Sequence, residues 1–274
     1  MARILIAGCG YVGGELAERL LERGDLVWGL KRDPESLPDG VAPCPRDLTR
    51  PETLGDLPRN LDAVVYAAGS DASEPEAYRA IYVDGLRNLI DALIAQGQQL
   101  SRLLVVTSTA VYAQASGEDV DENSPTTPSS FQGQTMLDSE SLALSSPFET
   151  AVIRFGGIYG PGRTRMIDQL RRSALTIPAG KSYTNRIHRD DCAGVLMHLL
   201  DASTVEPLYV GVDCDPAPRR EVVDWIANQL GVPPAAEKED APAGPNKRCR
   251  NRRLLASGYR FEYPTFREGY GSLL

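Results

Sequence analysis

Three closely spaced glycines near the N-terminus constrain the fold of this chain more than any other feature of its sequence. Gly8, Gly10 and Gly13 stand in the spacing G-x-G-x-x-G, directly after residues 3–7, a mostly apolar run that indicates a buried parallel strand. Residues 11–23 follow, with apolar side chains at helical spacing. A strand that turns on glycines directly into a helix predicts the first βα unit of an α/β fold.

Each glycine of this turn has its own steric reason. Gly8 permits the tight turn, Gly10 leaves the backbone bare so that a pyrophosphate can approach it, and Gly13 lets the helix and strand pack closely. The start of the helix adds unpaired amides and the positive end of a dipole. This context predicts a dinucleotide site at Gly8, Gly10, Tyr11, Val12 and Gly13, with a purely steric glycine turn as the alternative.

The end of the second predicted strand, residues 25–30, decides which dinucleotide is expected. A carboxylate there binds the ribose 2′-hydroxyl of NAD, whereas a basic group meets the 2′-phosphate of NADP. The strand is followed by Lys31 and Arg32, so the sequence favours NADP, with these two side chains as phosphate partners. Asp33 leaves NAD open, and two solvated loop charges are the simpler interpretation.

Apolar strands alternate with helical segments along the first two thirds of the chain. Strands are expected at residues 3–7, 25–30, 61–68, 103–107, 150–155 and 208–212, and helices at residues 11–23, 74–96, 136–144, 164–174, 190–200 and 219–230. Such alternation requires a parallel sheet with right-handed crossovers. We therefore predict an α/β fold of the Rossmann type, a doubly wound parallel sheet with a small C-terminal substrate lobe.

Length and composition allow two unequal parts. The 274 residues, 42% of them hydrophobic, suffice for a full sheet core and a modest second lobe. We assign residues 1–160 to the dinucleotide-binding domain and residues 161–274 to an interleaved small substrate-binding lobe and C-terminal tail. Residues 116–130, with two prolines and many Ser and Thr residues, are expected to form a loop, and residues 232–245 a surface excursion.

The charge balance limits the partners. A net charge of −8 repels nucleic acid and anionic lipid, so a small-molecule substrate is the expected partner. Local basic residues, described below, suggest that this substrate is anionic or nucleotide-linked. The five cysteines show no metal-ligand spacing and are read as reduced thiols, so no metal site is expected. The first residues are too short an apolar run for a signal peptide, and no later stretch is long enough for a membrane span. A cytoplasmic protein fits these features best.

Several short motifs together resemble one known family. Beyond the glycine turn they are residues 47–48, 67–69, 108–112, 154–162 and 187–191, which read DL, AAG, STAVY, RFGGIYGPG and IHRDD. The chain resembles the extended short-chain dehydrogenase/reductases, the NAD-dependent epimerase/dehydratase group. The resemblance implies cofactor contacts near the adenine (Asp47, Leu48), along its path (Ala67, Ala68, Gly69) and at the nicotinamide (Phe155, Gly156, Gly157, Ile158). The resemblance also leads us to expect a homodimer, formed through two helices that flank the sheet.

The chain departs from that family at its proton chemistry. The resemblance implies a Tyr and, four residues later, a Lys on one helix face, but Gln132 and Met136 occupy those positions, or Phe131 and Thr135 in a second register. Gln is no general base near neutral pH, and Met carries no charge. The family's asparagine on the preceding long helix is also replaced, by Tyr82.

Two hydroxyl groups remain as catalytic candidates. Ser108 stands where the resemblance places a catalytic serine, although a strand-end hydroxyl bonded to backbone is an equal alternative. Tyr112 is a candidate proton donor from the same loop, but an unassisted phenol is a poor donor near neutral pH.

Basic residues in the second half suggest where an anion could bind. Residues 247–253 carry five positive charges, and Arg248 and Arg250 among them, together with Arg163 and Arg165, are candidate substrate ligands. The alternative for the run is a solvated or internally paired segment. His188 is a further substrate candidate, with a structural packing role as the favoured alternative.

Two functions follow from these patterns. The first is an NAD(P)-binding oxidoreductase or a sugar-nucleotide epimerase/dehydratase-like protein with an atypical active site. The second is a catalytically silent NADP(H)-binding sensor or scaffold protein. The replaced Tyr–Lys pair separates them, because an enzyme must substitute that chemistry and a sensor need not.

Overall fold

The chain divides into two compact units that are interleaved along the sequence. The computed structural model describes residues 1–70, 72, 74–238 and 246–274. The first unit comprises Met1–Val111, Pro128–Arg154 and Ala193–Tyr209, and the second comprises Tyr112–Thr127, Phe155–Cys192 and Val210–Leu274. The chain returns to the first unit at Ala193–Tyr209, and the division into two domains at residue 160 stays a prediction.

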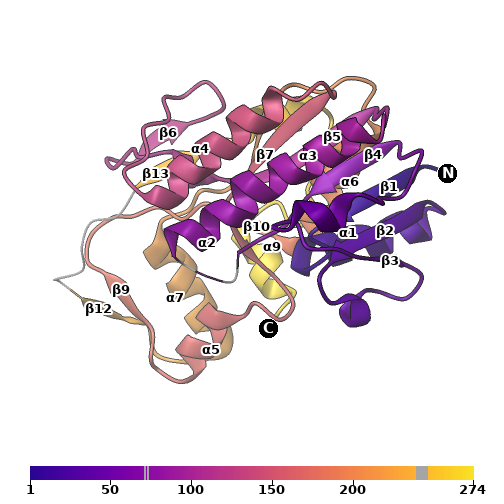
Figure 1. Ribbon diagram of the computed structural model, residues 1–274. Helices are drawn as coiled ribbons and strands as arrows, with labels where there is room; N and C mark the ends of the chain where they lie inside the picture. Colours follow the sequence, from indigo (N-terminus) through magenta and orange to yellow (C-terminus); the bar gives the residue numbers. More distant parts are fainter. Residues whose placement is uncertain (71, 73, 239–245) are drawn as a thin grey trace. The chain divides into compact units, whose positions relative to one another are not determined.

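A seven-stranded sheet in the described part of the chain confirms the predicted Rossmann-type architecture (Figure 1). Its order is β11-β7-β5-β4-β1-β2-β3. The strands are β1 (Arg3–Ala7), β2 (Leu26–Lys31), β3 (Ala42–Pro45), β4 (Ala63–Tyr66), β5 (Arg102–Ser108), β7 (Thr150–Phe155) and β11 (Leu208–Gly211). Ile4 pairs in parallel with Val27 on one side and with Ala63 on the other, so β1 lies inside the sheet between β2 and β4.

Helices connect these strands in the first unit. They are α1 (Tyr11–Glu22), α2 (Pro75–Arg79), the π-helix η3 (Ala80–Gly85), α3 (Leu86–Ala95), α4 (Phe131–Leu144) and α6 (Arg189–Asp201), with 3₁₀ turns η1 (Pro34–Ser36), η2 (Pro51–Leu54) and η4 (Thr109–Val111). Helices α3 and α4 run side by side across one face of the sheet (Figure 1).

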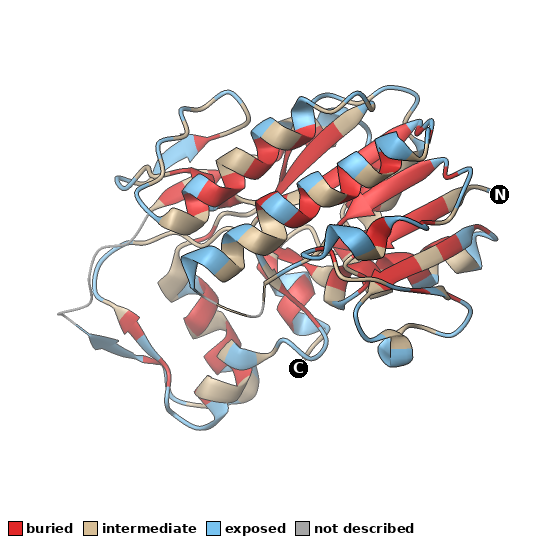
Figure 2. Cartoon of the chain, in the orientation of Figure 1, coloured by how far each residue is buried: buried red, intermediate tan, exposed pale blue. Residues whose placement is uncertain are grey.

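The core of the first unit lies between the sheet and these two helices. Leu86, Leu89 and Leu93 of α3 are fully buried against strand residues such as Val64 and Val105. Figure 2 shows the strands as mostly buried, whereas α3 and α4 alternate buried and exposed residues. This alternation follows from apolar side chains that recur every three to four residues and cover one helix face.

The second unit has a smaller core and short strand pairs. It contains the pairs β6 (Glu118–Val120) with β13 (Lys247–Cys249), β8 (Gly157–Tyr159) with β10 (Arg186–His188) and β9 (Thr176–Pro178) with β12 (Ala236–Lys238), and the helices α5 (Arg165–Arg171), α7 (Arg219–Leu230), α8 (Arg252–Ala256) and α9 (Phe266–Gly271). Its core gathers Ile167, Val222, Ile226 and Phe266, which are all fully buried.

Several predicted segments differ in detail from those observed, and the loop expected over residues 116–130 contains the short strand β6. The helix expected over residues 74–96 contains the π-helix, and the helix expected from Met136 begins at Phe131, because the Ser130 hydroxyl accepts the Gly133 amide and caps it. In the expected excursion over residues 232–245, β12 pairs with β9, and residues 239–245 lie outside the described residues.

Over the described residues, we find no helix with the length and apolar character needed to traverse a lipid bilayer.

Candidate functional site

The glycine turn forms a tight cradle in the first unit. Gly8 has a φ of +94°, and a Cβ atom on it would come within 2.3 Å of the Ala68 backbone. A Cβ atom on Gly13 would come within 2.4 Å of the Gly8 carbonyl oxygen, whereas one on Gly10 would meet nothing within 4 Å. The fold itself therefore requires Gly8 and Gly13, while Gly10 leaves open space beside the backbone.

The start of α1 completes this cradle. Its N-cap is Gly10, and no side chain caps the first-turn amides. Amides of this kind and the positive end of the helix dipole suit a pyrophosphate, so the residues present fit a dinucleotide. Cys9 is buried inside the turn, and burial raises the pKa of its thiol to about 11. The thiol therefore stays protonated and packs as a small apolar group.

The end of β2 presents basic side chains. Arg32 is exposed, and Lys31 Nζ donates a hydrogen bond to Ser36 Oγ. The Asp33 carboxylate accepts the Glu35 amide at 3.1 Å and so caps η1. Asp33 and Lys31 thus both have local partners, and the assignment of Lys31 and Arg32 to the phosphate of NADP stays a prediction.

Asp47 and Leu48 follow β3 as expected. The Asp47 carboxylate accepts hydrogen bonds from the Thr49 amide and hydroxyl at 2.9 and 2.8 Å. Burial would raise the pKa of Asp47, but these bonds and the charge of Arg32 outweigh it and hold the pKa below its usual value. Asp47 is therefore an anion that lies close enough to Arg32 to interact with it.

The segment after β4 lies directly against the turn. The Ala67 amide donates to the Ala7 carbonyl at 2.8 Å, and the Ala68 backbone is the surface that a Gly8 side chain would strike. Gly69 is exposed. The structure thus brings residues 67–69 together with the glycine turn, which is the arrangement expected if they line the path of a cofactor.

The residues expected at the nicotinamide belong to the second unit. Phe155 is buried, and the Gly156 amide donates to the Gly211 carbonyl at 3.0 Å. The Gly157 amide donates to the Asn185 carbonyl at 2.9 Å, and Ile158 pairs with Ile187 in β10. Their assignment to the cofactor stays a prediction.

Two of the predicted substrate arginines line one pocket in the second unit. This pocket, with a volume of about 670 Å³, is lined by Ile158, Gly162, Arg163, Thr164, Arg165, Asp168, Gln169 and Arg172. Arg172 was not predicted, because it reaches the same pocket as Arg163 and Arg165 only through the path of α5. Asp168 accepts a hydrogen bond from the Thr164 hydroxyl at 2.9 Å, and the three guanidinium groups leave the lining positive.

Arg248 and Arg250 lie within the protein's own ion pairs. Both contact the Asp119 carboxylate on β6, at 2.9 and 2.8 Å. Lys247 is buried, and its Nζ donates to the Tyr112 carbonyl at 2.6 Å. Burial lowers the pKa of Lys247. The placement matches the alternative of an internally paired segment, and the substrate role of the two arginines stays a prediction.

His188 and Tyr112 are also enclosed by the second unit. The His188 ring is 1% exposed, lies 4.0 Å from the Tyr263 ring centroid and accepts the Asp190 amide at Nδ1. Tyr112 is fully buried, and its hydroxyl donates to the Asp121 carbonyl at 2.7 Å. Both side chains thus serve packing in the structure, and their predicted roles in substrate binding and proton transfer remain untested.

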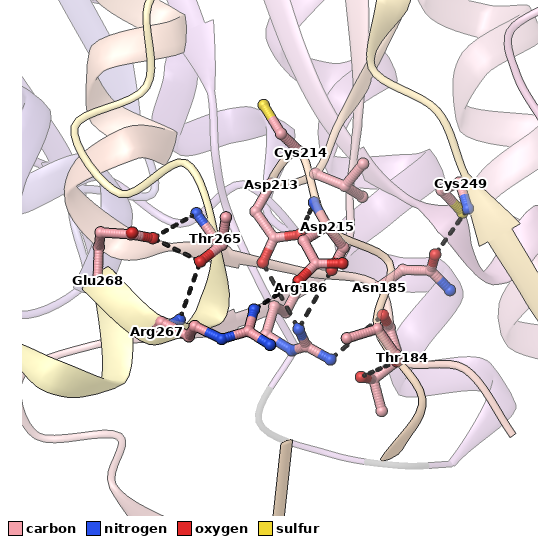
Figure 3. A network of polar contacts seen from close by, with 12 residues as sticks. Thr184, Asn185, Arg186, Asp213, Cys214, Asp215, Cys249, Thr265, Arg267 and Glu268 are labelled. Atoms are coloured by element: carbon pink, nitrogen blue, oxygen red, sulfur yellow. Dashed lines mark hydrogen bonds and ion pairs between the residues drawn. The ribbon is translucent and has the colours of Figure 1, made fainter. Parts of the chain in front are cut away.

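A polar network in the second unit surrounds the buried pair of Arg186 and Asp213 (Figure 3). Their closest atoms are 3.6 Å apart, and Asp213 is 2% exposed. Nearby, Arg267 of α9 contacts Asp215 at 3.1 Å. Burial raises the pKa of Asp213 to about 7, against the opposing charge of Arg186. This network ties α9 to the segment after β11 and was not predicted from the sequence.

Comparison with known proteins now decides the family. The sequence profile of the NAD dependent epimerase/dehydratase family matches residues 4–209. This chain belongs to that family.

Relatives resemble it along their full length. A 3-diazoavenalumate denitrifying reductase from a Streptomyces species is 28% identical, with 98% of this chain and 99% of that protein covered. The solved structure of a candidate NAD-dependent epimerase/dehydratase from Methylobacillus flagellatus is 38% identical with a TM-score of 0.85, over 99% of this chain and 97% of that one. Human epimerase family protein SDR39U1, solved with NADPH, shares the fold, with a TM-score of 0.83, 23% identity and 98% of each chain covered.

The epimerase/dehydratase chain lacks its expected proton-transfer pair on α4. Gln132 is half-buried, and Met136 is 1% exposed. In the other register, Phe131 packs edge-on against Tyr78 with ring centroids 5.8 Å apart, and Thr135 is buried. Neither register places a titratable group at these positions. Ser108 is half-buried at the end of β5, and its Oγ accepts the Ala110 amide at 3.2 Å.

A buried ion pair fixes α4 on the sheet of the first unit. Arg154 of β7 contacts both carboxylate oxygens of Glu140, at 2.9 and 2.6 Å, and Thr107 of β5 donates to the same carboxylate at 3.0 Å. Arg154 and Glu140 are each 5% exposed. Sequence reasoning missed this pair, because a Glu on a helix and an Arg in a strand carry no local signal of contact.

Proposed function

We propose that this protein is an NADP(H)-dependent oxidoreductase that reduces a carbonyl group of an anionic, nucleotide-linked or otherwise acidic small molecule. The glycine cradle carries the proposal, because Gly8 and Gly13 shape the turn while Gly10 and the uncapped start of α1 leave room for a pyrophosphate. Arg32 and Lys31 beside this cradle favour the phosphorylated cofactor. The reductase among the relatives and the NADPH of the human relative support both choices.

The arginine-lined pocket indicates the class of substrate. Planar guanidinium groups bind phosphate and carboxylate in two-point contacts, and three arginines are among the residues that line this pocket. Its volume of about 670 Å³ falls within the range of sites that enclose small molecules. A substrate with a carboxylate or phosphate handle is therefore the candidate that these side chains suit best.

A catalytically silent cofactor sensor is the second candidate. The observation that favours it is the pair of Gln132 and Met136, neither of which can exchange a proton near neutral pH. A sensor would bind NADPH through the same cradle and would turn over no substrate.

Oxidation of NADPH tests the proposal. The purified protein is mixed with NADPH and a panel of keto sugars, nucleotide-linked keto sugars and keto acids, each paired with a neutral analogue, and loss of the reduced-nicotinamide absorbance is followed. We expect turnover of at least one acidic substrate and weaker turnover of its neutral analogue. NADPH binding without any turnover across the panel would favour the sensor.

The same preparation tests the cofactor choice. Arg32→Ala should weaken NADPH binding by about tenfold or more, equal to ~1.4 kcal/mol, and leave NADH binding nearly unchanged. Arg59→Ala, an exposed arginine of the same unit, is the matched control and should alter neither affinity. Equal losses for the two cofactors in Arg32→Ala would contradict NADP.

A further inference from the structure

We propose that Tyr82 is the proton donor of this site, so that the active phenol comes from the π-helix η3 instead of from α4. The inference rests on the proposed oxidoreductase function and names the residue that replaces the missing pair. It is argued from residues of the first unit alone.

Tyr82 faces the segment that adjoins the glycine turn. Its hydroxyl lies 3.6 Å from the point where a Cβ atom on Gly69 would stand. Gly69 follows Ala68, whose backbone contacts the turn at Gly8. The hydroxyl is thus aimed at the same edge of the sheet as the cradle, and the Tyr82 side chain is half-buried and open to a ligand.

A specific contact holds the π-helix in the form that presents Tyr82. Tyr66, buried at the end of β4, donates its hydroxyl to the Ile81 carbonyl inside the π-helix at 2.5 Å. A Cβ atom on Gly85 would come within 2.9 Å of this hydroxyl, so Gly85 makes room for it. Single π-helical turns within α-helices occur often at functional sites, and here the turn also rotates the residues that follow α2.

A second phenol supports the first. The rings of Tyr78 and Tyr82 lie with centroids 4.4 Å apart, and Phe131 of α4 packs edge-on against Tyr78. Burial, the nearby Tyr82 and a hydrogen bond between the two hydroxyls all raise the pKa of Tyr78. Tyr78 therefore keeps its proton, and once Tyr82 has given up its own proton the Tyr78 hydroxyl is the donor that would stabilise the Tyr82 tyrosinate.

The proposed step balances as follows. NADPH held by the glycine cradle would supply the hydride that the carbonyl carbon of the substrate takes up, with NADP⁺ as the oxidised product. The carbonyl π bond opens onto oxygen, the Tyr82 hydroxyl gives that oxygen its proton, and the product is an alcohol. The tyrosinate accepts a hydrogen bond from Tyr78, which stabilises its charge, and then takes a proton from water.

Three variants and one chemical probe test this assignment. Tyr82→Phe keeps the ring and removes the hydroxyl, so kcat should fall roughly 10²–10⁴-fold, the usual contribution of a positioned acid, with the NADPH dissociation constant unchanged. Tyr78→Phe removes only the supporting hydrogen bond and should lower kcat by a smaller factor. Gln132→Ala, at the family's tyrosine position, should leave kcat close to the wild-type value.

The probe does not depend on turnover. Tetranitromethane nitrates accessible tyrosine rings, and peptide mass spectrometry gives the rate at each position. At ten times its dissociation constant, NADPH should slow nitration of Tyr82 about tenfold, because mainly the free protein reacts. Tyr183, a half-buried tyrosine of the second unit, is the control and should react at the same rate with and without cofactor.

The outcomes separate this inference from the proposed function. Wild-type turnover that persists in Tyr82→Phe, or nitration of Tyr82 that NADPH leaves unchanged, overturns the role of Tyr82 while NADPH-dependent reduction stands. NADPH binding and protection of Tyr82 without turnover of any substrate by the wild-type protein overturn the oxidoreductase function, and the proton-donor role with it.

Discussion

At the scale of single residues, the three glycines of the turn have separable roles. Gly8 adopts a left-handed φ and lies against the Ala68 backbone, and Gly13 lies against the Gly8 carbonyl. Side chains at these two positions would conflict with the chain itself. Gly10 has no such neighbour, so the fold does not need a glycine there, and the missing side chain leaves room for a ligand that approaches the turn from outside.

This difference predicts opposite behaviour of two alanine variants. Gly8→Ala should lower the free energy of unfolding by at least ~1–3 kcal/mol, since it adds backbone strain to a steric clash. Gly10→Ala should stay within about 0.5 kcal/mol of the wild type and yet bind NADPH at least about tenfold more weakly. Urea denaturation and a cofactor titration measure the two quantities. Undiminished NADPH affinity in Gly10→Ala would show that nothing approaches the turn at that point.

At the scale of elements, the position of α4 depends on a few buried contacts. Glu140 of α4 accepts hydrogen bonds from Arg154 and Thr107, which lie on two different strands of the sheet. Gly133 brings the first turn of α4 close to Pro128 and Ala110, where a Cβ atom would come within 2.4 and 2.7 Å. The helix that should carry the family's acid/base pair is therefore firmly placed, although the pair itself is absent.

Removing one partner of the buried pair should be costly. Glu140→Ala leaves the Arg154 guanidinium buried without its carboxylate, and we expect a loss of about 3–5 kcal/mol in the free energy of unfolding. Asp138→Ala on the same helix is the matched control. Asp138 pairs with Arg79 at 2.9 Å, but the Arg79 side chain is half exposed, and exposed ion pairs contribute only about 0–1 kcal/mol to the free energy of unfolding. Similar losses in the two variants, measured by urea denaturation, would refute the assignment of the stability to the buried pair.

The same elements show what the sequence could predict. β7 and α7 begin and end where the apolar pattern placed them, because periodicity is a local signal. The glycine cradle was predictable for the same reason. The π-helix was not, since Tyr66, distant in sequence, supports it through Ile81. The ion pairs of Arg248 and Arg250 with Asp119 likewise depend on the pairing of β6 with β13, which no local sequence pattern predicts.

At the scale of the whole molecule, one buried carboxyl links stability to pH. Burial raises the pKa of Asp213 from 3.8 to about 7, so its folded form holds a proton more tightly than its unfolded form. The raised pKa of Asp213 stabilises the folded protein, and this contribution is fully present at pH values below the pKa of the unfolded state. That contribution is lost as the pH rises through the folded value, so the window runs from about pH 4 to pH 7.

Denaturation at several pH values tests this link. Across that window, titration of Asp213 should lower the free energy of unfolding by up to ~1.4 kcal/mol per pH unit. Asp213→Asn cannot titrate and should lack this component, whereas Asp224→Asn, at an exposed position on α7, should keep the wild-type dependence. Identical pH profiles for the wild type and Asp213→Asn would contradict the prediction.

The position of β11 along the chain has a consequence for synthesis on the ribosome. This strand completes the edge of the sheet beside β7, yet it ends at Gly211 in a chain of 274 residues. Until roughly three quarters of the chain has been translated, the backbone amides and carbonyls along that side of β7 have no strand to pair with. The nascent chain therefore carries an open edge at β7 from the translation of Phe155 until that of Gly211, and this edge is where a chaperone would protect it from aggregation.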